Sequence, residues 1–566
     1  MKIHHLYFAV LLCFNVVTLP AQPASEMYQF IVQHEADRGS LERFYTIACS
    51  PERSNRLQQF YREQEAKLLQ MNFDQFSVEG KVDFLLIKRD IQNALHELAT
   101  EQSDLRQLEW YTASGTPLYE MEKVRRRGGE LKPALIADQF HQMAVKVDAQ
   151  LKQLAQRQPL SAALASRGAE ALEGQRAALK SVTEFYQDYD PAFAWWTKQP
   201  ARVLDSLLKS FSKATGSKVD PNGLNKDDGS GIRGTPIGRA EILRQLQLEM
   251  IPYTPEELID IANREFAWCD AELLKASREM GFGDNWKAAQ EKVKQSYVPA
   301  GQQPQAIMDL YNQSIDFLKK NDLITIPPLA EETWRMVMMP AQQQRVSPFF
   351  LGGEVLMISY PTNDMSHPDK LMSMRGNNPH FSRATVHHEL IAGHHLEGFM
   401  NDRFYSYRHF YNPFWIEGWS LYWEFILWDK NFPRSPEDRM GMLFWRMHRC
   451  ARIIFSLNYH LGQWTPQQCI NFLVDRVGHE RANAEGEVRR SFTGGYGPLY
   501  QLAYMTGAFQ FYALKKELVD SGKMTLKAYH DAVMRENCMP IEMLRAILTG
   551  NAPAKDFRTS WRFYHP

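Results

Sequence analysis

The sequence predicts a mostly α-helical protein, and three observations support this prediction. Apolar residues recur at three- and four-residue spacing, with dense charge between them, in the stretches 40–69, 82–98, 133–157 and 160–186, which is typical of amphipathic helices. Two short segments rich in Val, Met, Ile and Tyr, 333–339 and 354–361, have strand character. With 566 residues, 44% of them hydrophobic, the chain can bury a large core. We expect helices around a small β-sheet or hairpin, in one or two closely packed units.

The first 21 residues have the features of a cleavable secretory signal. Lys2 precedes an apolar run from Leu6 to Leu19, which is too short to span a bilayer. Cleavage is expected near Ala21, so that the mature chain is secreted or periplasmic. Cys13 lacks the small residue expected directly before a lipid-modified cysteine, and lipid anchoring is therefore not expected.

The longest break in the helical pattern lies between Val219 and Gly238. It contains Pro221-Asn222-Gly223 and an Asp- and Gly-rich run, which are turn-forming sequences. A domain linker and an ordered loop near a cleft explain the break equally well. Soon after it, the capping box Thr254-Pro255-Glu256-Glu257 predicts the start of a helix. The predicted organisation is a signal peptide (1–21), an N-terminal helical region (22–220), a loop or linker (221–238) and a C-terminal region (239–566).

The charge balance argues against a polyanionic partner. Lys and Arg total 65 against 66 Asp and Glu, a net charge of −1, so no dominant attraction to nucleic acid or to an anionic membrane is expected. Five of the six cysteines follow the signal; they are scattered and form no Cys-x-x-Cys pair. We expect a peptide or small amide as the partner and no transmembrane segment after signal removal. One disulfide bond stays possible, and the oligomeric state cannot be read.

The most informative segment runs from Val386 to Glu397. It reads Val-His-His-Glu-Leu-Ile-Ala-Gly-His-His-Leu-Glu, so that four of the chain's 17 histidines fall in a nine-residue window beside a glutamate. A second motif, Trp415-Ile416-Glu417-Gly418-Trp419, follows. Imidazole and carboxylate are ligands that zinc prefers, and catalytic zinc has three protein ligands and one open position. These motifs predict a metallohydrolase site.

The spacing of the histidines requires a break in the helix. The usual zincin pattern has its second histidine four positions after the first, where this chain has Ala392. His394, six positions after His388, would be turned roughly 120° away from it on an ideal helix. A bulge or helix end at Ala392-Gly393 would bring His394 back, because glycine tolerates the backbone angles required. His395 is the competing choice, on the same face but about 10 Å further along the axis; we favour His394.

These residues resemble a bacterial family known as domain of unknown function 885. Its signature is a histidine-glutamate pair, then Pro-Gly-His-His-Leu-Gln, then Glu-Gly-Trp-x-Leu-Tyr-x-Glu. The chain has His388-Glu389, Gly393-His394-His395-Leu396 and a match from Glu417 to Glu424. Further matching positions are Arg452, His460, 462–465, 487–490, Pro498 and 504–507. The chain departs from the family pattern at Ala392, Glu397, Ser456, Ser491 and Tyr500.

The family is similar in turn to the helical gluzincin peptidases, which include thimet oligopeptidase, angiotensin-converting enzyme and carboxypeptidase Taq. This resemblance implies a gluzincin-type helical fold with a deep central cleft, and 239–566 as its metallopeptidase-like catalytic region. It also implies that the strand-like segment 354–361 lies beside the metal helix and holds extended substrate, although a small structural hairpin is an equal alternative. Those enzymes supply the third zinc ligand as a glutamate on the next helix, which points to Glu417.

The predicted centre holds one Zn²⁺. Such an ion polarises a carbonyl and lowers the pKa of its water ligand to roughly 7. Its expected ligands are His388, His394 and Glu417. Glu389, adjacent to a ligand, is the expected general base. By resemblance, Tyr504 would donate a hydrogen bond to the oxyanion, with His460 as the second candidate.

Three further residues are candidates for supporting roles. Glu424 lies seven positions after Glu417, on about the same helix face, where it can orient a ligand or form a salt bridge. Arg490 can bind a substrate carboxylate or form a structural ion pair. Tyr360, at the start of the matching region, is a candidate for substrate binding.

The sequence therefore predicts a secreted or periplasmic zinc peptidase. Two alternatives are a metal-dependent amidase that acts on a non-peptide or cell-wall amide, and a binding protein that retains the fold with little catalysis. The departures at Ser456, Ser491 and Tyr500 keep the binding protein open. A measurement of stoichiometric zinc would distinguish an enzyme from a binding protein. The sequence does not give the side-chain preference, nor whether the protein is an endopeptidase or a carboxypeptidase.

Overall fold

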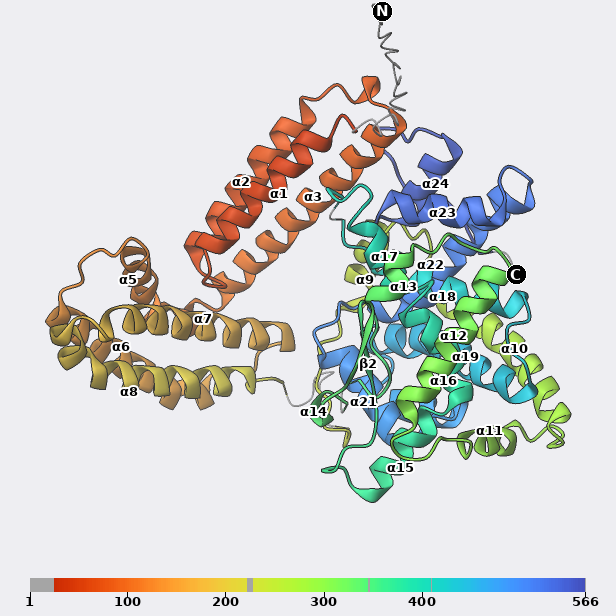
Figure 1. Ribbon diagram of the computed structural model, residues 1–566. Helices are drawn as coiled ribbons and strands as arrows, with labels where there is room; N and C mark the ends of the chain where they lie inside the picture. The colour runs from red at the N-terminus through yellow and green to blue at the C-terminus, as the bar shows by residue number, and fades with distance from the viewer. Residues whose placement is uncertain (1–24, 221–227, 345–346, 409, 565–566) are drawn as a thin grey trace, which may run out of the picture.

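The computed structural model describes residues 25–220, 228–344, 347–408 and 410–564, and the predicted signal peptide lies outside them. The chain is helical almost throughout, as expected, with one small β-sheet (Figure 1). None of the helices in the described ranges has both the length and the apolar character needed to cross a membrane.

The N-terminal region is an array of helices. Its helices are α1 (Tyr28–Phe44), α2 (Pro51–Leu69), α3 (Val78–Gln107), α4 (Glu109–Thr112), α5 (Pro117–Arg125), α6 (Pro133–Gln153), α7 (Ala162–Gln187) and α8 (Pro191–Gly216). The stretch 40–69, predicted as one helical segment, spans two helices. The break arises because Ser50 caps α2 by accepting a hydrogen bond from the Arg53 N–H, and Pro51 occupies the first helical position.

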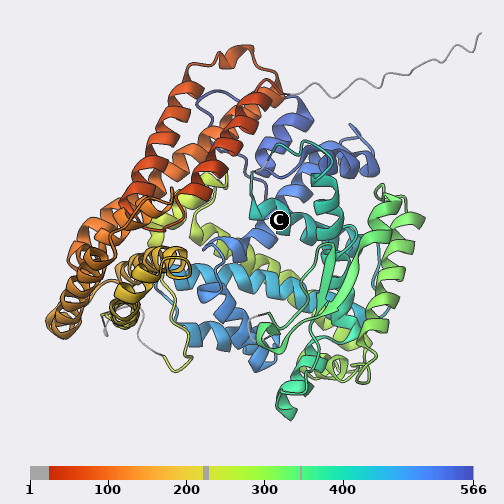
Figure 2. The same cartoon turned by 60° about the vertical axis from the view of Figure 1, so that its left-hand side comes forward.

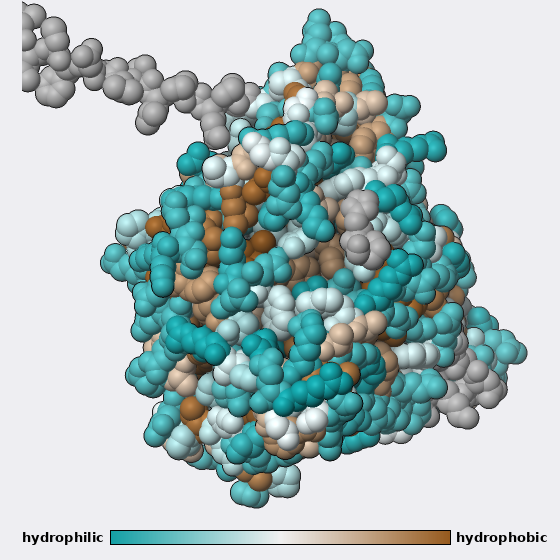
Figure 3. All heavy atoms as spheres, turned by 90° about the vertical axis from the view of Figure 1, so that its right-hand side faces the viewer, coloured by the Kyte–Doolittle hydropathy of each residue, from teal (hydrophilic) through white to brown (hydrophobic). Residues whose placement is uncertain are grey.

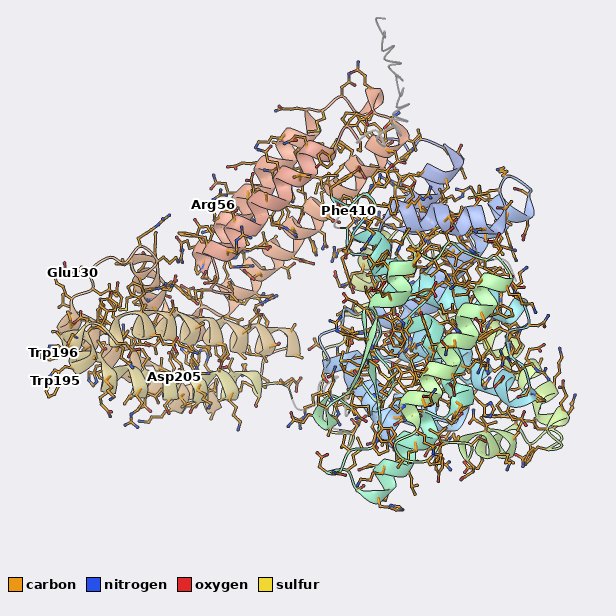
Figure 4. All side chains as sticks on the ribbon, viewed as in Figure 1. Arg56, Glu130, Trp195, Trp196, Asp205 and Phe410 are labelled. Atoms are coloured by element: carbon orange, nitrogen blue, oxygen red, sulfur yellow. The ribbon has the colours of Figure 1, made fainter. Side chains whose placement is uncertain are left out.

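This array contributes to two separate hydrophobic cores. Buried residues of α1, α2 and α3 share one core with the C-terminal region, whereas α4 to α8 surround a second core that includes Phe140, Leu179 and Phe211. Figures 1 and 2 show α5 to α8 as a bundle that projects from the rest of the molecule. At its outer end Trp195 and Trp196 point outward (Figure 4), with 84% and 51% of their surface exposed.

The predicted break after α8 is present, and its described part is an ordered loop. α9 (Gly238–Leu248) begins at the end of the loop. The Asp228 carboxylate accepts a hydrogen bond from the Gln467 N–H at 2.6 Å, and Arg489 donates to the Gly231 carbonyl at 3.3 Å. Residues 228–237 are therefore held against the C-terminal helices, and 221–227 lie outside the described residues.

The next segment carries the β-sheet. Its helices are α10 (Pro255–Glu279), α11 (Trp286–Lys294), α12 (Gln303–Lys320), α13 (Pro328–Thr333), α14 (Ala341–Gln344) and α15 (His367–Gly376). The predicted capping box is confirmed, since the Thr254 and Glu257 side chains each bond the other's backbone N–H. Strands β1 (Arg335–Met338) and β2 (Val355–Ile358) pair in parallel. The alternative of a hairpin is wrong, because parallel strands need the crossover connection that runs through α14.

The C-terminal helices build the centre of the molecule. They are α16 (Pro379–Glu389), α17 (His394–Asn401), α18 (Pro413–Asp429), α19 (Pro436–His460), α20 (Pro466–Phe472), α21 (Arg481–Thr493), α22 (Tyr500–Lys515), α23 (Leu526–Glu536) and α24 (Ile541–Thr549). α18 and α22 pack closely because glycines meet at their crossing: a Cβ on Gly418 would stand 2.6 Å from the Gly507 Cα. Trp415, Trp419 and Trp423 of α18 are completely buried, so these motif aromatics pack in the core.

The surface and the cysteines agree with the composition. The face in Figure 3 is predominantly hydrophilic, with scattered hydrophobic residues. All five described cysteines are buried and free of disulfide bonds: Cys49, Cys269, Cys450, Cys469 and Cys538.

Candidate metal centre

The helix that carries the first histidines ends three residues before Ala392, and the turn that follows it contains the predicted break at Ala392-Gly393. α16 ends at Glu389 and α17 begins at His394. In the turn between them, the Gly393 N–H donates to the His387 carbonyl at 3.0 Å. A Cβ on Gly393 would overlap the carbonyl of His388, so the tight turn requires glycine. The predicted break at Ala392-Gly393 is thus confirmed.

Because of this turn, three donor atoms from three helices converge. His388 Nε2 and His394 Nε2 lie 3.5 and 3.3 Å from the same oxygen, Glu417 Oε2. The three side chains form a group whose candidate ligand atoms all lie within 4.8 Å of one another. The competing histidine, His395, points elsewhere, since its Nε2 lies 2.7 Å from the carbonyl oxygen of Ala330. The geometry therefore favours His394.

The remaining polar atoms of these side chains are held by neighbours. The His388 Nδ1–H donates to Glu424 at 2.9 Å, which leaves Nε2 free to bind a cation. His394 Nδ1 lies 3.2 Å from the Ser420 hydroxyl, and the Tyr500 hydroxyl donates to Glu417 Oε1. Each donor is thus oriented with its unused atom toward the other two, and Glu424 has the orienting contact that its spacing suggested.

The chemistry of this donor set fits a divalent cation. Burial alone would raise the pKa of the Glu417 carboxyl, but the charges of His394 and His388 hold it well below its usual range. Glu417 Oε2 is buried and has no hydrogen-bond partner among the described residues. An ionised carboxylate oxygen that faces two imidazole nitrogens, without another donor, is a suitable site for Zn²⁺.

Glu389 lines the same cavity as the three donors. This cavity has a volume of about 420 Å³, in the lower part of the range for small-molecule sites. One wall is the segment 349–352, where Gly352 packs so closely on Glu389 that a Cβ there would overlap the carboxylate. Burial raises the pKa of the Glu389 carboxyl, while the charges of His388 and His394 oppose the rise. A carboxyl with a raised pKa is suited to accept and return a proton near neutral pH.

Tyr504 contacts the centre from α22. Its ring stacks on the His388 ring with centroids 6.1 Å apart and an interplanar angle of 15°. No hydrogen bond joins its hydroxyl to another described residue, whereas the Tyr500 hydroxyl is engaged by Glu417. Burial, with the charge of Glu417, raises the pKa of Tyr504 to about 12. The Tyr504 hydroxyl is therefore a neutral donor at physiological pH.

Two of the candidate residues lie away from the cavity. His460 is at the end of α19, and neither ring nitrogen has a hydrogen-bond partner among the described residues. Burial lowers its pKa to about 4. Tyr360 follows β2, and its hydroxyl accepts a hydrogen bond from the Gly301 N–H. Neither residue belongs to the cavity lining.

The structure also identifies residues that the motif analysis gave no role. Tyr500, noted only as a departure from the family pattern, bonds a candidate ligand. Its position four residues before Tyr504 placed it on the same helix face. Arg449 and Arg452 line the cavity together with Arg490, and their three-residue spacing on α19 indicated a shared face. Trp445 lines it as well.

The fold and the site define a helical protein with a largely buried candidate centre of two histidines and one glutamate. The chain belongs to the family described as bacterial protein of unknown function (DUF885), whose model matches residues 45–548. No curated protein matches it.

Two solved structures are similar to the chain over nearly its whole length. One is described as "a putative lipoprotein of unknown function from Shewanella oneidensis", with 15% identity, a TM-score of 0.68, and coverage of 93% of this chain and 100% of that one. The other, "the putative lipoprotein from Colwellia psychrerythraea", has 15% identity, a TM-score of 0.57, and coverage of 92% and 97%. At this identity the likeness shows a shared fold.

Proposed function

We propose that the protein is a zinc-dependent peptidase that hydrolyses peptide bonds. One observation carries the proposal: three convergent donors, His388, His394 and Glu417, share a cavity with a partly buried carboxylate, Glu389, that is not one of them. Two functions are thereby available in one cavity, a cation site and a proton acceptor. The motif resemblance to the helical gluzincins supports the same assignment, with the cavity acting as the substrate cleft.

The candidate metal ligands and Glu389 have distinct parts in the proposed reaction. The zinc ion, when held by the two histidines and Glu417, would polarise the substrate carbonyl and make water a stronger nucleophile at neutral pH. Glu389 accepts the proton of the attacking water at its carboxylate. The same carboxyl then donates this proton to the nitrogen of the leaving amine, which completes the cleavage.

Charge that develops on the carbonyl oxygen needs a positioned donor. The Tyr504 hydroxyl has this function in our proposal, since it lines the cavity and is not committed to another described residue. Tyr500 has a different function. Its hydroxyl holds Glu417 in place, and Glu424 does the same for His388.

We place the enzyme in the cell envelope, as a secreted or periplasmic protein. The signal-like sequence 1–21 supports this location. Both of these solved structures are described as "putative lipoprotein", and lipoproteins are exported from the cytoplasm.

Cleavage of a peptide library by the metal-loaded protein, read by mass spectrometry, tests the proposal. We expect new termini to appear with zinc, to disappear after treatment with a chelator, and to return when zinc is restored, because the three donors cannot polarise a carbonyl without the cation. Stoichiometric zinc without any cleaved peptide would contradict the peptidase assignment and favour another amide substrate or a binding role.

The two tyrosines of α22 are expected to fail in different ways. Tyr504→Phe should lower kcat by about 10²- to 10³-fold, with little change in KM or zinc content, because it removes a donor used mainly in the transition state. Tyr500→Phe should instead weaken zinc binding by about 10- to 100-fold, because it releases Glu417. Zinc titration and steady-state kinetics of both variants separate the two effects. Unchanged kcat in Tyr504→Phe, with a lower melting temperature, would make Tyr504 a core residue.

A further inference from the structure

We propose that Arg449, Arg452 and Arg490 form a subsite that binds a carboxylate of the substrate close to the bond that is cut. The inference rests on the proposed function and narrows its substrate class. The carboxylate is either the free C-terminus of the peptide or an acidic side chain near the cleaved bond. All three arginines line the cavity that contains the candidate metal ligands.

Nearby carboxylates pair these arginines only in part. Glu424 lies 3.4 Å from Arg449, but it is already bonded to His388. Glu487 lies 2.7 Å from Arg452 and 3.9 Å from Arg490. Three guanidinium groups therefore share two carboxylates within ion-pair distance.

Each guanidinium also retains an unused donor. Arg449, Arg452 and Arg490 are 4%, 2% and 7% exposed. The buried Nε of Arg449, Nη1 of Arg452 and Nε of Arg490 have no hydrogen-bond partner among the described residues. The Arg490 guanidinium makes no hydrogen bond to another described side chain, and its pKa is raised, although burial opposes the rise, chiefly by the charge of Glu487. Buried donors of this kind are costly unless an acceptor reaches them, and a planar carboxylate matches the guanidinium fork.

The position of the subsite fits a carboxylate near the reacting bond. The Arg449 and Arg452 guanidinium carbons lie 4.6 and 4.3 Å from the centre of the Tyr504 ring. The same ring stacks on His388 at 6.1 Å. One aromatic ring thus contacts both the two arginines and a candidate metal ligand, so a carboxylate bound by the arginines would belong to a residue close to the cleaved bond.

Titration calorimetry on the full chain tests this inference with Ala-Ala-Ala and its C-terminal amide as probes. We use the Glu389→Gln protein to prevent turnover, and repeat the titration after chelation so that the carboxylate cannot bind the ion itself. The free acid should bind about 10- to 100-fold more tightly than the amide, the range expected for hydrogen bonds between charged groups. A second comparison, of Ala-Glu-Ala-amide with Ala-Gln-Ala-amide, shows whether an acidic side chain also tightens binding.

A matched pair of variants assigns the preference to the subsite. Arg490→Gln should remove most of the preference for the free acid. We choose Arg490 because its ion pair, 3.9 Å from Glu487, is the longest of the three, so its replacement is expected to disturb the fold least. Arg489→Gln should retain the preference, because Arg489 is next in sequence but does not line the cavity. Equal binding of acid and amide by the Glu389→Gln protein with all three arginines intact would overturn the inference, even if the additional Arg490→Gln change prevented folding. Cleavage of peptides without any preference for a carboxylate would also overturn the subsite, but it would leave the peptidase proposal standing. Binding of the carboxylate that depends on Arg490, without any cleavage, would reject the peptidase proposal and retain the subsite.

Discussion

His394→Ala is expected to lose zinc and to abolish hydrolysis, whereas His395→Ala is expected to retain both. His394 Nε2 lies 3.3 Å from Glu417 Oε2, while His395 bonds the Ala330 carbonyl. Loss of a residue that only orients a ligand typically weakens metal binding by about 10- to 100-fold. Removing one of the three ligands themselves should weaken zinc binding by more than this. Zinc content by elemental analysis and peptide cleavage measure the two effects.

The two histidines are adjacent, so each variant controls for the other. His395→Ala removes one hydrogen bond to a backbone carbonyl, and a loss of stability of about 1 kcal/mol is expected from that alone. Circular dichroism verifies that both variants fold. Full zinc occupancy in His394→Ala, together with loss of zinc in His395→Ala, would mean that the ligand set is wrong. His388→Ala and Glu417→Ala should behave like His394→Ala.

Local patterns predicted most of the helices and the turn between the two candidate histidine ligands, because the causes of both are local, whereas Glu417 was expected from the family resemblance. A glycine directly after the missing zincin histidine position allowed a turn, and that turn is observed between α16 and α17. The Thr254–Glu257 capping box likewise depends on four consecutive residues. Helical periodicity identified α3, α6 and α7 for the same reason.

The rest of the architecture depends on contacts between distant segments. Residue composition gives the strands, but their parallel pairing depends on the path of the sixteen residues from Met339 to Glu354 between them. Nothing in the sequence of α1 to α3 distinguishes their core from that of α4 to α8. The contact between Tyr500 and Glu417 spans 83 positions, and the one between Arg452 and Glu487 spans 35. Such contacts are set by the crossing of helices, where Gly418 meets Gly507.

Glu389→Gln is expected to retain zinc and to lower turnover by about 10²-fold or more. Glu389 is not among the three converging donors, so the amide should leave the cation site intact while it removes the proton acceptor. A general base acts when deprotonated. Because the pKa of Glu389 is raised in the fold, mainly by burial, the activity of the parent should rise with pH above the usual carboxyl range, and this acidic limb should be absent from the variant's pH profile.

Glu397→Gln is the matched control, because Glu397 lines the same cavity and its pKa is raised for the same reason, burial. Its carboxylate lies 3.7 Å from His394 Nδ1, on the side of the ring away from the converging donors, and the family pattern has glutamine at this position. Its replacement should therefore change turnover by less than about 10-fold, within the range for an outer partner of a ligand. Parent-like turnover in Glu389→Gln would contradict Glu389 as the general base. An equal loss of turnover in both variants would contradict it too, because a general base at position 389 predicts a larger loss in Glu389→Gln than in Glu397→Gln.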